Sequence, residues 1–254
     1  MCLILLAYQT HPRYPLIIAA NRDEFHARPT LAAHFWSDAP NLLAGRDLQN
    51  GGTWMGITQQ GQFAALTNYR EAQQTPSLPS YSRGLLVSDF LRTSQTLTAY
   101  ITNCLQQADL YKGFNLLLGN LQQLYYLSNR SAGYQLVPAG VHALSNHLLN
   151  TPWVKVQAGK NALQTLLNQD FPLTALFDVL ADRTPVADAQ LPKTGVSLAW
   201  ERLLSPRFIV SPEYGTRSST VLRINTVGIV DFCERSFNAT GDLEKVVNYQ
   251  FTVQ

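Results

Sequence analysis

The sequence contains no cluster of lysine and arginine, and its formal net charge is only +2 over 254 residues. Nucleic-acid binding depends on basic side chains gathered against phosphates, so no nucleic-acid partner is expected. Charged residues make up 14% of the chain and hydrophobic residues 46%, which is the composition of a globular protein with a substantial core.

Cysteine is scarce. Cys2, Cys104 and Cys233 are odd in number and far apart, and no CxxC pair occurs. This pattern predicts neither a disulfide framework nor a zinc site and favours a reducing compartment. His142 and His147 lie five apart, a spacing that does not suit zinc on a helix or on one face of a strand. We therefore expect no metal and no cofactor.

Long apolar runs are also missing. The opening stretch CLILLAY lacks the basic leader and the length of a signal peptide, and no later run approaches the ~20 apolar residues of a spanning helix. The sequence therefore predicts a cytoplasmic protein without stable membrane insertion. It gives no indication of the oligomeric state.

Two common catalytic motifs are absent. No GxSxG nucleophile elbow occurs, which argues against a serine hydrolase of the α/β type. The glycine-rich GGTWMG lacks the Lys-Ser/Thr of a phosphate-binding loop. We interpret it as a tight turn into a strand that packs Trp54 near the functional site.

The order of expected elements indicates the fold class. Apolar β-type runs at 2–9, 15–22, 41–47, 52–58 and 63–69 precede two helical patterns at 85–93 and 97–108. Strands return at 114–120, 123–129 and 140–146, helices follow at 153–169 and 173–181, and three strands fill 217–253. Paired helices do not suit parallel βαβ winding, so we predict a single α+β domain over 1–254, with two stacked antiparallel sheets and helices outside.

The most informative residue is Cys2. Aminopeptidases remove an initiator Met before a small side chain, which would place a thiol and a free α-amine on one residue. If the first two strands form a hairpin centred near His11–Pro12, paired positions sum to about 23. Cys2 then lies opposite Asn21, with Asp23 just beyond the pairing.

This placement predicts a chemistry. A thiol attacks acyl groups as thiolate, so it needs a proton acceptor nearby. A free α-amine ordinarily has a pKa of about 7.7–8.0 and can accept and return that proton. Asp23 could hold the amine and thiol in place. The plainer alternatives are a buried Cys2 that only fills the core and an NRDE stretch that forms a solvated turn.

Several motifs carry a family resemblance. MC at the start, AANRDEF, GGTWMGI, ALTNYR, ALSNHLLNTPWVKV and YGTRSSTVL occur in this order over nearly the whole chain. Together they resemble the NRDE family, also called the transport-and-Golgi-organisation family, a branch similar to the N-terminal-nucleophile hydrolases. The resemblance implies a four-layer αββα sandwich, in agreement with the element order.

The resemblance also implies site residues. It assigns Cys2 as the nucleophile, Asp23 as the residue that orients it, Asn68 and Asn146 as oxyanion donors, and Arg217 as an arginine near the nucleophile. Asn68 and Asn146 could instead be strand-end turn residues, and Arg217 an ordinary surface residue.

The rest of the NRDE motif supports the site. Asn21, Arg22 and Glu24 are substrate-binding or supporting residues, with no step assigned to Arg22 or Glu24. Ala20 stands where the hydrolases carry an arginine. Arg22 could compensate, facing the other way on the strand.

Two functions follow. The first is a cysteine N-terminal-nucleophile hydrolase of linear amides, or a related acyltransferase, acting on a small-molecule acyl or amide substrate. The second is a non-enzymatic carrier or trafficking protein for haem or lipid, since no reaction is firmly attached to the family and a fold is not a function. Tyr, Phe and Trp number 11, 11 and 4, which suits an apolar or aromatic ligand and equally suits core packing.

Overall fold

The computed structural model describes residues 2–72 and 81–254, and the chain divides into two compact units. Unit 1 takes its described residues from 2–27, 70–72 and 138–252, and unit 2 from 28–69, 81–137 and 253–254. Met1, whose removal the sequence predicts, lies outside the described residues.

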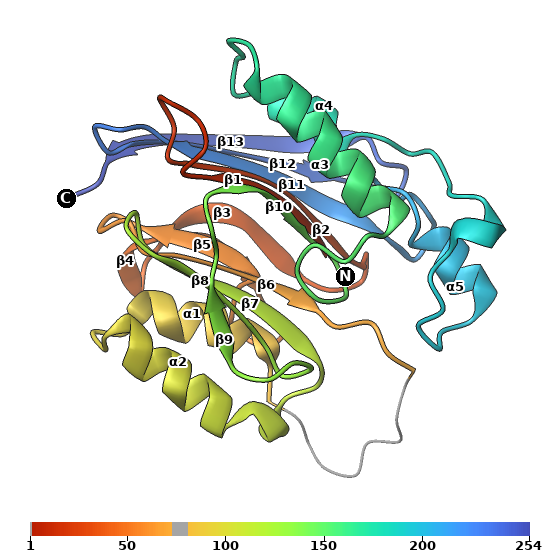
Figure 1. Cartoon of the computed structure of the whole chain (residues 1–254), viewed down its shortest axis with the longest axis horizontal. Coiled ribbons are helices and arrows are strands. Elements are labelled where there is room, and N and C mark those ends of the chain that lie inside the picture. Colours follow the sequence, from red (N-terminus) through yellow and green to blue (C-terminus); the bar gives the residue numbers. More distant parts are fainter. Residues whose placement is uncertain (1, 73–80) are drawn as a thin grey trace. The chain divides into compact units, whose positions relative to one another are not determined.

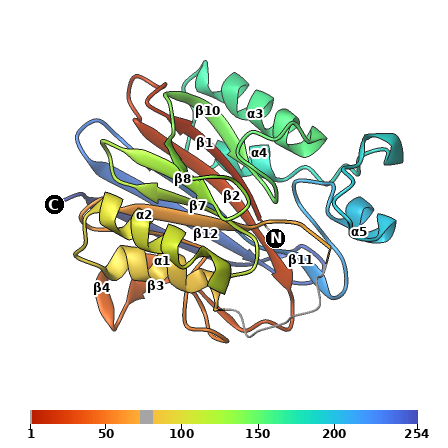
Figure 2. The same cartoon turned by 60° about the horizontal axis from the view of Figure 1, so that its bottom comes forward.

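Unit 1 is built on an antiparallel sheet of six strands in the order β10-β1-β2-β11-β12-β13. Helices α3 and α4 cover one face of this sheet, and α5 lies past the end at which β1 begins (Figures 1 and 2). The elements are β1 (Cys2–Tyr8), β2 (Leu16–Phe25), β10 (Gly140–Leu144), α3 (Val154–Leu167), α4 (Ala175–Leu180), α5 (Leu198–Leu203), β11 (Tyr214–Ile224), β12 (Ile229–Phe237) and β13 (Leu243–Thr252).

Unit 2 repeats this plan with seven antiparallel strands, β3 through β9, in sequence order. Helices α1 and α2 lie side by side on one face of its sheet (Figures 1 and 2). The elements are β3 (Thr30–Trp36), β4 (Ala39–Asp47), β5 (Met55–Thr58), β6 (Phe63–Asn68), α1 (Arg83–Arg92), α2 (Leu97–Gln106), β7 (Phe114–Gly119), β8 (Leu124–Ser128) and β9 (Tyr134–Leu136).

Most predicted strands and helices are present, but three elements were missed. Strands β3 and β9 are the two edges of the unit 2 sheet, and β9 is exposed at all three positions. An edge strand pairs on one side only and can stay largely in solvent, so it lacks a strong apolar signal. The short α5 buries only Glu201, which leaves no apolar stripe to detect.

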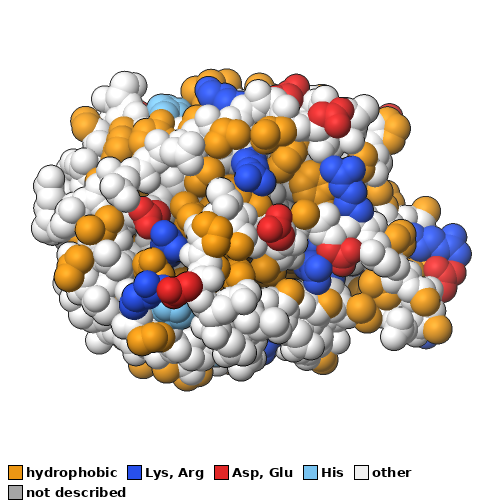
Figure 3. Space-filling view, turned by 90° about the horizontal axis from the view of Figure 1, so that it is seen from above, with side chains coloured by type: hydrophobic (Ala, Val, Ile, Leu, Met, Phe, Trp, Pro, Cys, Tyr) orange, Lys and Arg blue, Asp and Glu red, His pale blue; other side chains and the backbone are white. Residues whose placement is uncertain are grey.

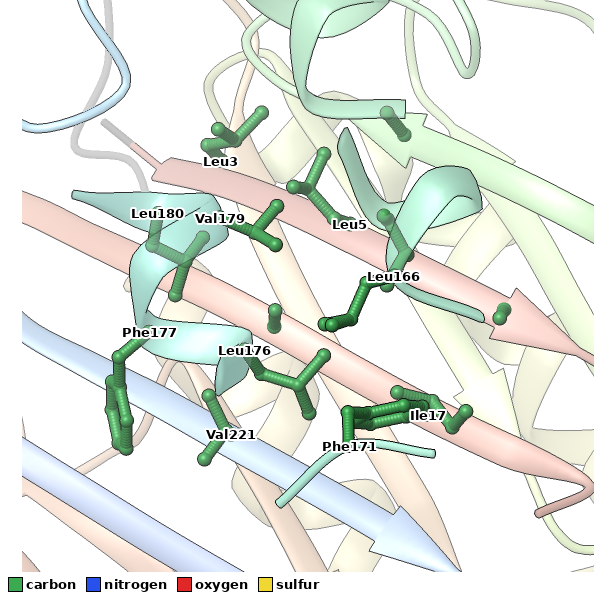
Figure 4. Close-up of a cluster of buried hydrophobic side chains, with 14 of the residues drawn as sticks. Leu3, Leu5, Ile17, Leu166, Phe171, Leu176, Phe177, Val179, Leu180 and Val221 are labelled. Atoms are coloured by element: carbon green, nitrogen blue, oxygen red, sulfur yellow. The ribbon is translucent and has the colours of Figure 1, made fainter. Parts of the chain in front are cut away.

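The core of unit 1 lies between its sheet and helices α3 and α4. Alternate residues of the central strands, such as Leu3, Leu5 and Ile17, face the helices, because successive side chains of a strand point to opposite faces. Figure 4 shows Leu176 and Leu180 of α4 packed over these strands. Outside, Lys and Arg side chains are interspersed with Asp and Glu over the face seen in Figure 3.

The core predicts a stability difference between two leucines. Leu176 is fully buried, so Leu176→Ala is expected to lower the free energy of unfolding by about 2–5 kcal/mol through lost burial and a residual cavity. Leu198, which is 50% exposed, is the matched control. Leu198→Ala is expected to change the free energy of unfolding by less than about 0.5 kcal/mol. Urea unfolding measures both, and equal effects would contradict this account of the core.

Candidate active site

The position of Cys2 is set by the hairpin of β1 and β2. Cys2 pairs with Arg22 and Leu3 with Asn21, so paired positions sum to 24 and the predicted register was wrong by one residue. The Gln9 amide donates to the Pro15 carbonyl oxygen at 2.7 Å, which extends the pairing and centres the connection on residue 12. The residue opposite Cys2 is therefore Arg22, not Asn21.

In this register Asp23 follows Arg22, the residue that pairs with Cys2. Asp23 therefore lies next to the end of β1 at which the backbone nitrogen of Cys2 is found. Ala20 and Arg22 are two apart on β2 and so face the same side of the sheet. The expectation that Arg22 faces the other way from the missing arginine was therefore wrong. Arg22 lies on the same face as Ala20, two residues farther along β2.

Asp23 is almost fully buried, with 1% of its surface exposed, and it is held by β11. The Thr216 hydroxyl donates to Oδ1 of Asp23 at 2.8 Å, and the Tyr214 hydroxyl donates to the Asp23 carbonyl oxygen at 2.8 Å. Burial raises the pKa of the Asp23 carboxyl, while the positive charge of Lys155 acts to lower it. The carboxyl is thus fixed in position and costly to ionise.

Cys2 is buried and lies beside Asp23, not in an isolated apolar core. Burial raises the pKa of the Cys2 thiol, and the negative charge of Asp23 raises it further. Arg22 and a hydrogen bond from the Asp23 backbone lower it. Because the raising effects prevail, the thiol is mostly protonated at neutral pH and needs a base to become a nucleophile.

Asn146 lies on the other side of β1. Strand β10 pairs Leu144 with Ile4, and the same register continued by two residues brings Asn146 level with Cys2. The Ser145 hydroxyl is 3.2 Å from both the Cys2 carbonyl oxygen and Oδ1 of Asn146. Asn146 is fully buried. The structure thus brings together Cys2, Asp23 and Asn146.

Asn21 has a supporting position. Its Nδ2 donates to the carbonyl oxygens of Leu180 and Arg207, at 3.1 and 2.7 Å, and its Oδ1 accepts from the Ser219 hydroxyl at 2.6 Å. These bonds tie the strand that carries Asp23 to the end of α4 and to β11.

Arg217 lies on β11 between the residues that pair with Asp23 and Arg22, and Glu24 follows Asp23 on β2. Arg217 occupies the bulge where the β11–β2 register shifts, and its Nη1 donates to the carbonyl oxygens of Phe25 and His26 at 3.0 and 2.9 Å. Oε1 of Glu24 accepts from the Phe25 amide at 3.0 Å. Both side chains fasten the end of β2, just past Asp23.

Two predicted residues belong to unit 2. Asn68 is the last residue of β6 and pairs with Phe114 of β7. Trp54 precedes β5, and its ring lies against Gly45, where a side chain would collide with it. The roles predicted for Asn68 and Trp54 toward Cys2 stay predictions.

Three buried charged residues of unit 1 were missed. Lys155 of α3 donates to the Leu204 carbonyl oxygen at 2.8 Å, and burial, together with the positive charge of Arg70, lowers its pKa to about 8. Nη1 of Arg70 pairs with Oε2 of Glu201 at 2.6 Å, and both side chains are almost fully buried. Lys155 interacts electrostatically with both Asp23 and Cys2.

Arg70 and Lys155 line an open pocket. The Arg70 guanidinium stacks on the Trp153 ring, 4.7 Å from its centroid. The rest of the wall is mainly apolar, formed by Val154, Val186, Leu191, Pro192 and Leu204. Sequence signals for this pocket existed, since Arg70 ends ALTNYR and Trp153 and Lys155 lie in ALSNHLLNTPWVKV, whereas Glu201 lies in no motif.

The fold is that of the N-terminal-nucleophile hydrolases. A cysteine-to-alanine variant of the conjugated bile acid hydrolase of Clostridium perfringens matches with a TM-score of 0.50, over 99% of this chain and 97% of that one, at 8% sequence identity. The predicted fold class, α+β with two antiparallel sheets of this type, is confirmed.

The sequence comparisons identify the family. The family described as Transport and Golgi organisation 2 matches residues 1–239. The Transport and Golgi organization 2 homolog of Mus musculus is 34% identical to this chain over 281 residues. The Transport and Golgi organization protein 2 homolog of Homo sapiens is 34% identical over 282 residues. In each comparison 100% of both chains is covered. The chain belongs to the Transport and Golgi organisation 2 family, and the resemblance seen in its motifs is confirmed.

Proposed function

We propose that this chain is a cysteine N-terminal-nucleophile enzyme that hydrolyses linear amides or transfers their acyl group, once Met1 has been removed. One observation carries the proposal: the buried carboxyl of Asp23 lies at the backbone-nitrogen end of Cys2. A carboxylate in that position can hold a free α-amine beside the thiol that the amine must deprotonate.

The reaction balances with these groups alone. The α-amine takes the thiol proton as Sγ of Cys2 attacks the amide carbon, which forms a tetrahedral intermediate. The C–N bond then breaks, the proton passes from the α-amine to the leaving nitrogen, and a thioester remains. Water, or an acceptor nucleophile in the transfer reaction, attacks the thioester and restores the thiol.

The developing oxyanion needs donors. Asn146 lies level with Cys2, and its amide can supply one hydrogen bond, while Asn68 is proposed as the second donor. Removing one such donor typically costs ~10²–10³ in kcat. The Clostridium perfringens protein with the shared fold is named as a hydrolase of conjugated bile acids, which supports amide chemistry on this scaffold.

The chain is proposed to act as a single functional domain in the cytoplasm on a small-molecule substrate. Within residues 2–72 and 81–254, none of the helices has the length and apolarity needed to cross a membrane.

Acyl trapping tests the proposal. Processed protein is incubated with a panel of amides and acyl-CoAs, and intact mass spectrometry follows both the loss of Met1 and any acyl adduct. We expect an adduct on Cys2 that disappears in Cys2→Ala, with Cys233→Ala as a control that keeps it. Haem or lipid binding without an adduct from any donor would overturn the enzyme and favour the carrier.

A further inference from the structure

The hydroxyl of Ser145 lies between Cys2 and Asn146, and the proposed reaction gives it no role. Its Oγ is 3.2 Å from the carbonyl oxygen of Cys2 and 3.2 Å from Oδ1 of Asn146. Only 3% of Ser145 is exposed. A serine hydroxyl has one proton to donate, so it bonds one of these two acceptors at a time or shares its proton between them. Ser145 therefore contacts both the proposed nucleophile and the proposed oxyanion donor.

The backbone that carries Asn146 is fixed from two sides. The Arg70 amide donates to the Asn146 carbonyl oxygen at 2.7 Å. Four residues later the chain turns back onto β10, where the Asn150 amide donates to the Ala143 carbonyl oxygen at 2.8 Å. The Ala143 amide in turn donates to Oδ1 of Asn150 at 3.0 Å. These bonds hold the main chain of Asn146 in place, but they do not determine how its side-chain amide is turned.

The Ser145 hydroxyl controls the orientation of that amide. An asparagine side chain carries its acceptor oxygen and its donor nitrogen on one carbon, so a group that holds Oδ1 also directs Nδ2. With Oδ1 of Asn146 turned toward the Ser145 hydroxyl, the NH₂ group is directed to the other side of the amide. A hydrogen bond received at Oδ1 also polarises the amide, because hydrogen bonds in a buried chain strengthen one another. The NH₂ group is then a stronger donor to a developing oxyanion.

We propose that Ser145 is a positioning residue that acts through Asn146, because its hydroxyl holds the amide oxygen and so directs the NH₂ group to the oxyanion that forms when Cys2 attacks. This inference rests on the proposed function and adds a residue to the same site. The oxyanion develops only as the thiolate adds to the carbonyl carbon. The hydroxyl therefore contributes to the rate of acylation and little to the binding of the acyl donor. Ser145 itself exchanges no proton with the substrate.

Acylation by para-nitrophenyl acetate tests the proposal, since the Cys2 thiolate expels nitrophenolate from this ester through a tetrahedral oxyanion and keeps the acetyl group as a thioester. Stopped-flow release of nitrophenolate, corrected for release by Cys2→Ala, gives the limiting rate and the half-saturating concentration. Ser145→Ala is expected to lower the limiting rate by roughly tenfold and to leave the half-saturating concentration within about twofold. Asn146→Ala, which removes the whole amide, is expected to lower the rate by ~10²–10³. Ser128→Ala removes a buried hydroxyl that donates to the Phe114 carbonyl oxygen at 2.7 Å, and it is expected to keep the rate.

A double-mutant cycle shows whether Ser145 acts through Asn146. In the Asn146→Ala background, Ser145→Ala is expected to change the limiting rate by less than about twofold, because the amide that the hydroxyl holds is gone. The same tenfold loss in that background, or a wild-type rate in Ser145→Ala alone, would overturn the inference and leave the proposed reaction intact. Circular dichroism shows that each variant is folded.

The orientation of the amide is also measured without any reaction. Nuclear magnetic relaxation of Nδ2 of Asn146, whose signal is the side-chain amide signal lost in Asn146→Ala, gives its order parameter. The order parameter is expected to fall in Ser145→Ala and to keep its wild-type value in Ser128→Ala. If para-nitrophenyl acetate and the other acyl donors leave wild-type Cys2 unlabelled, the proposed reaction fails, and the order parameter alone decides whether Ser145 holds the amide. An unchanged order parameter in Ser145→Ala would overturn the positioning role.

Discussion

Protein that keeps one glycine ahead of Cys2 is expected to form acyl-enzyme ~10²–10⁴ times more slowly than protein that begins at Cys2. The glycine converts the α-amine of Cys2 into an amide nitrogen, which cannot accept a proton. Burial and Asp23 raise the pKa of the thiol, so little thiolate forms without that base. The two preparations differ by one residue outside the strand, and mass spectrometry of the thioester over time gives both rates.

The pH dependence of the same two preparations separates loss of the base from misplacement of the strand. Labelling of protein that begins at Cys2 should rise through the range of an α-amine, with a pKa of about 7.7–8.0. Residual labelling of the extended protein should rise only above the ordinary thiol value of 9.0, because the thiol then ionises unaided and its pKa is raised. Equal rates and identical pH profiles would show that the α-amine is not the base.

The sheet pairing shows how far the sequence alone leads. The apolar β-type runs correctly predicted a hairpin of the first two strands, because a buried strand is recorded directly in its side chains. Its register depends on the connection, and residues 9–15 carry no turn signal strong enough to choose between centres at 11.5 and 12. A shift of one residue decides whether Asn21 or Arg22 faces Cys2, and only the structure settles it.

The buried cations show a different limit. Arg70 follows a strand and Lys155 lies on a helix 85 positions later, and neither position has a local pattern that predicts burial of a charge. Lys155 is buried because α3 packs on the sheet while its ammonium reaches the Leu204 carbonyl, a contact between distant segments. Local patterns predict elements and motif residues, whereas a site assembled from separate elements requires the tertiary structure.

Asp23→Asn is expected to lower the rate of acyl-enzyme formation by about 10²–10⁴-fold and to leave the protein at least as stable at pH 7. The amide keeps the shape of the carboxyl but loses the charge that holds the α-amine. Stability is retained because burial raises the pKa of Asp23, so the folded state favours the uncharged acid. A carboxyl whose pKa is raised on folding stabilises the folded state at pH values below its ordinary pKa of 3.8, where it is protonated. That stabilisation is lost as the pH rises through the pKa of the folded state.

The wild-type protein therefore bears the cost of the buried charge at neutral pH, and the asparagine variant does not. The stability advantage of Asp23→Asn should shrink as pH falls toward 3.8, where wild-type Asp23 is itself protonated in the folded state. Asp47→Asn is the matched control, because Asp47 is also buried but accepts from Nε and Nη2 of Arg28 at 3.1 and 2.6 Å. That variant should lose stability and keep the reaction. Urea unfolding at several pH values measures the stability of both variants, and the labelling rate measures their reaction. An Asp23→Asn protein that is less stable yet fully active would show that this carboxylate serves the fold alone.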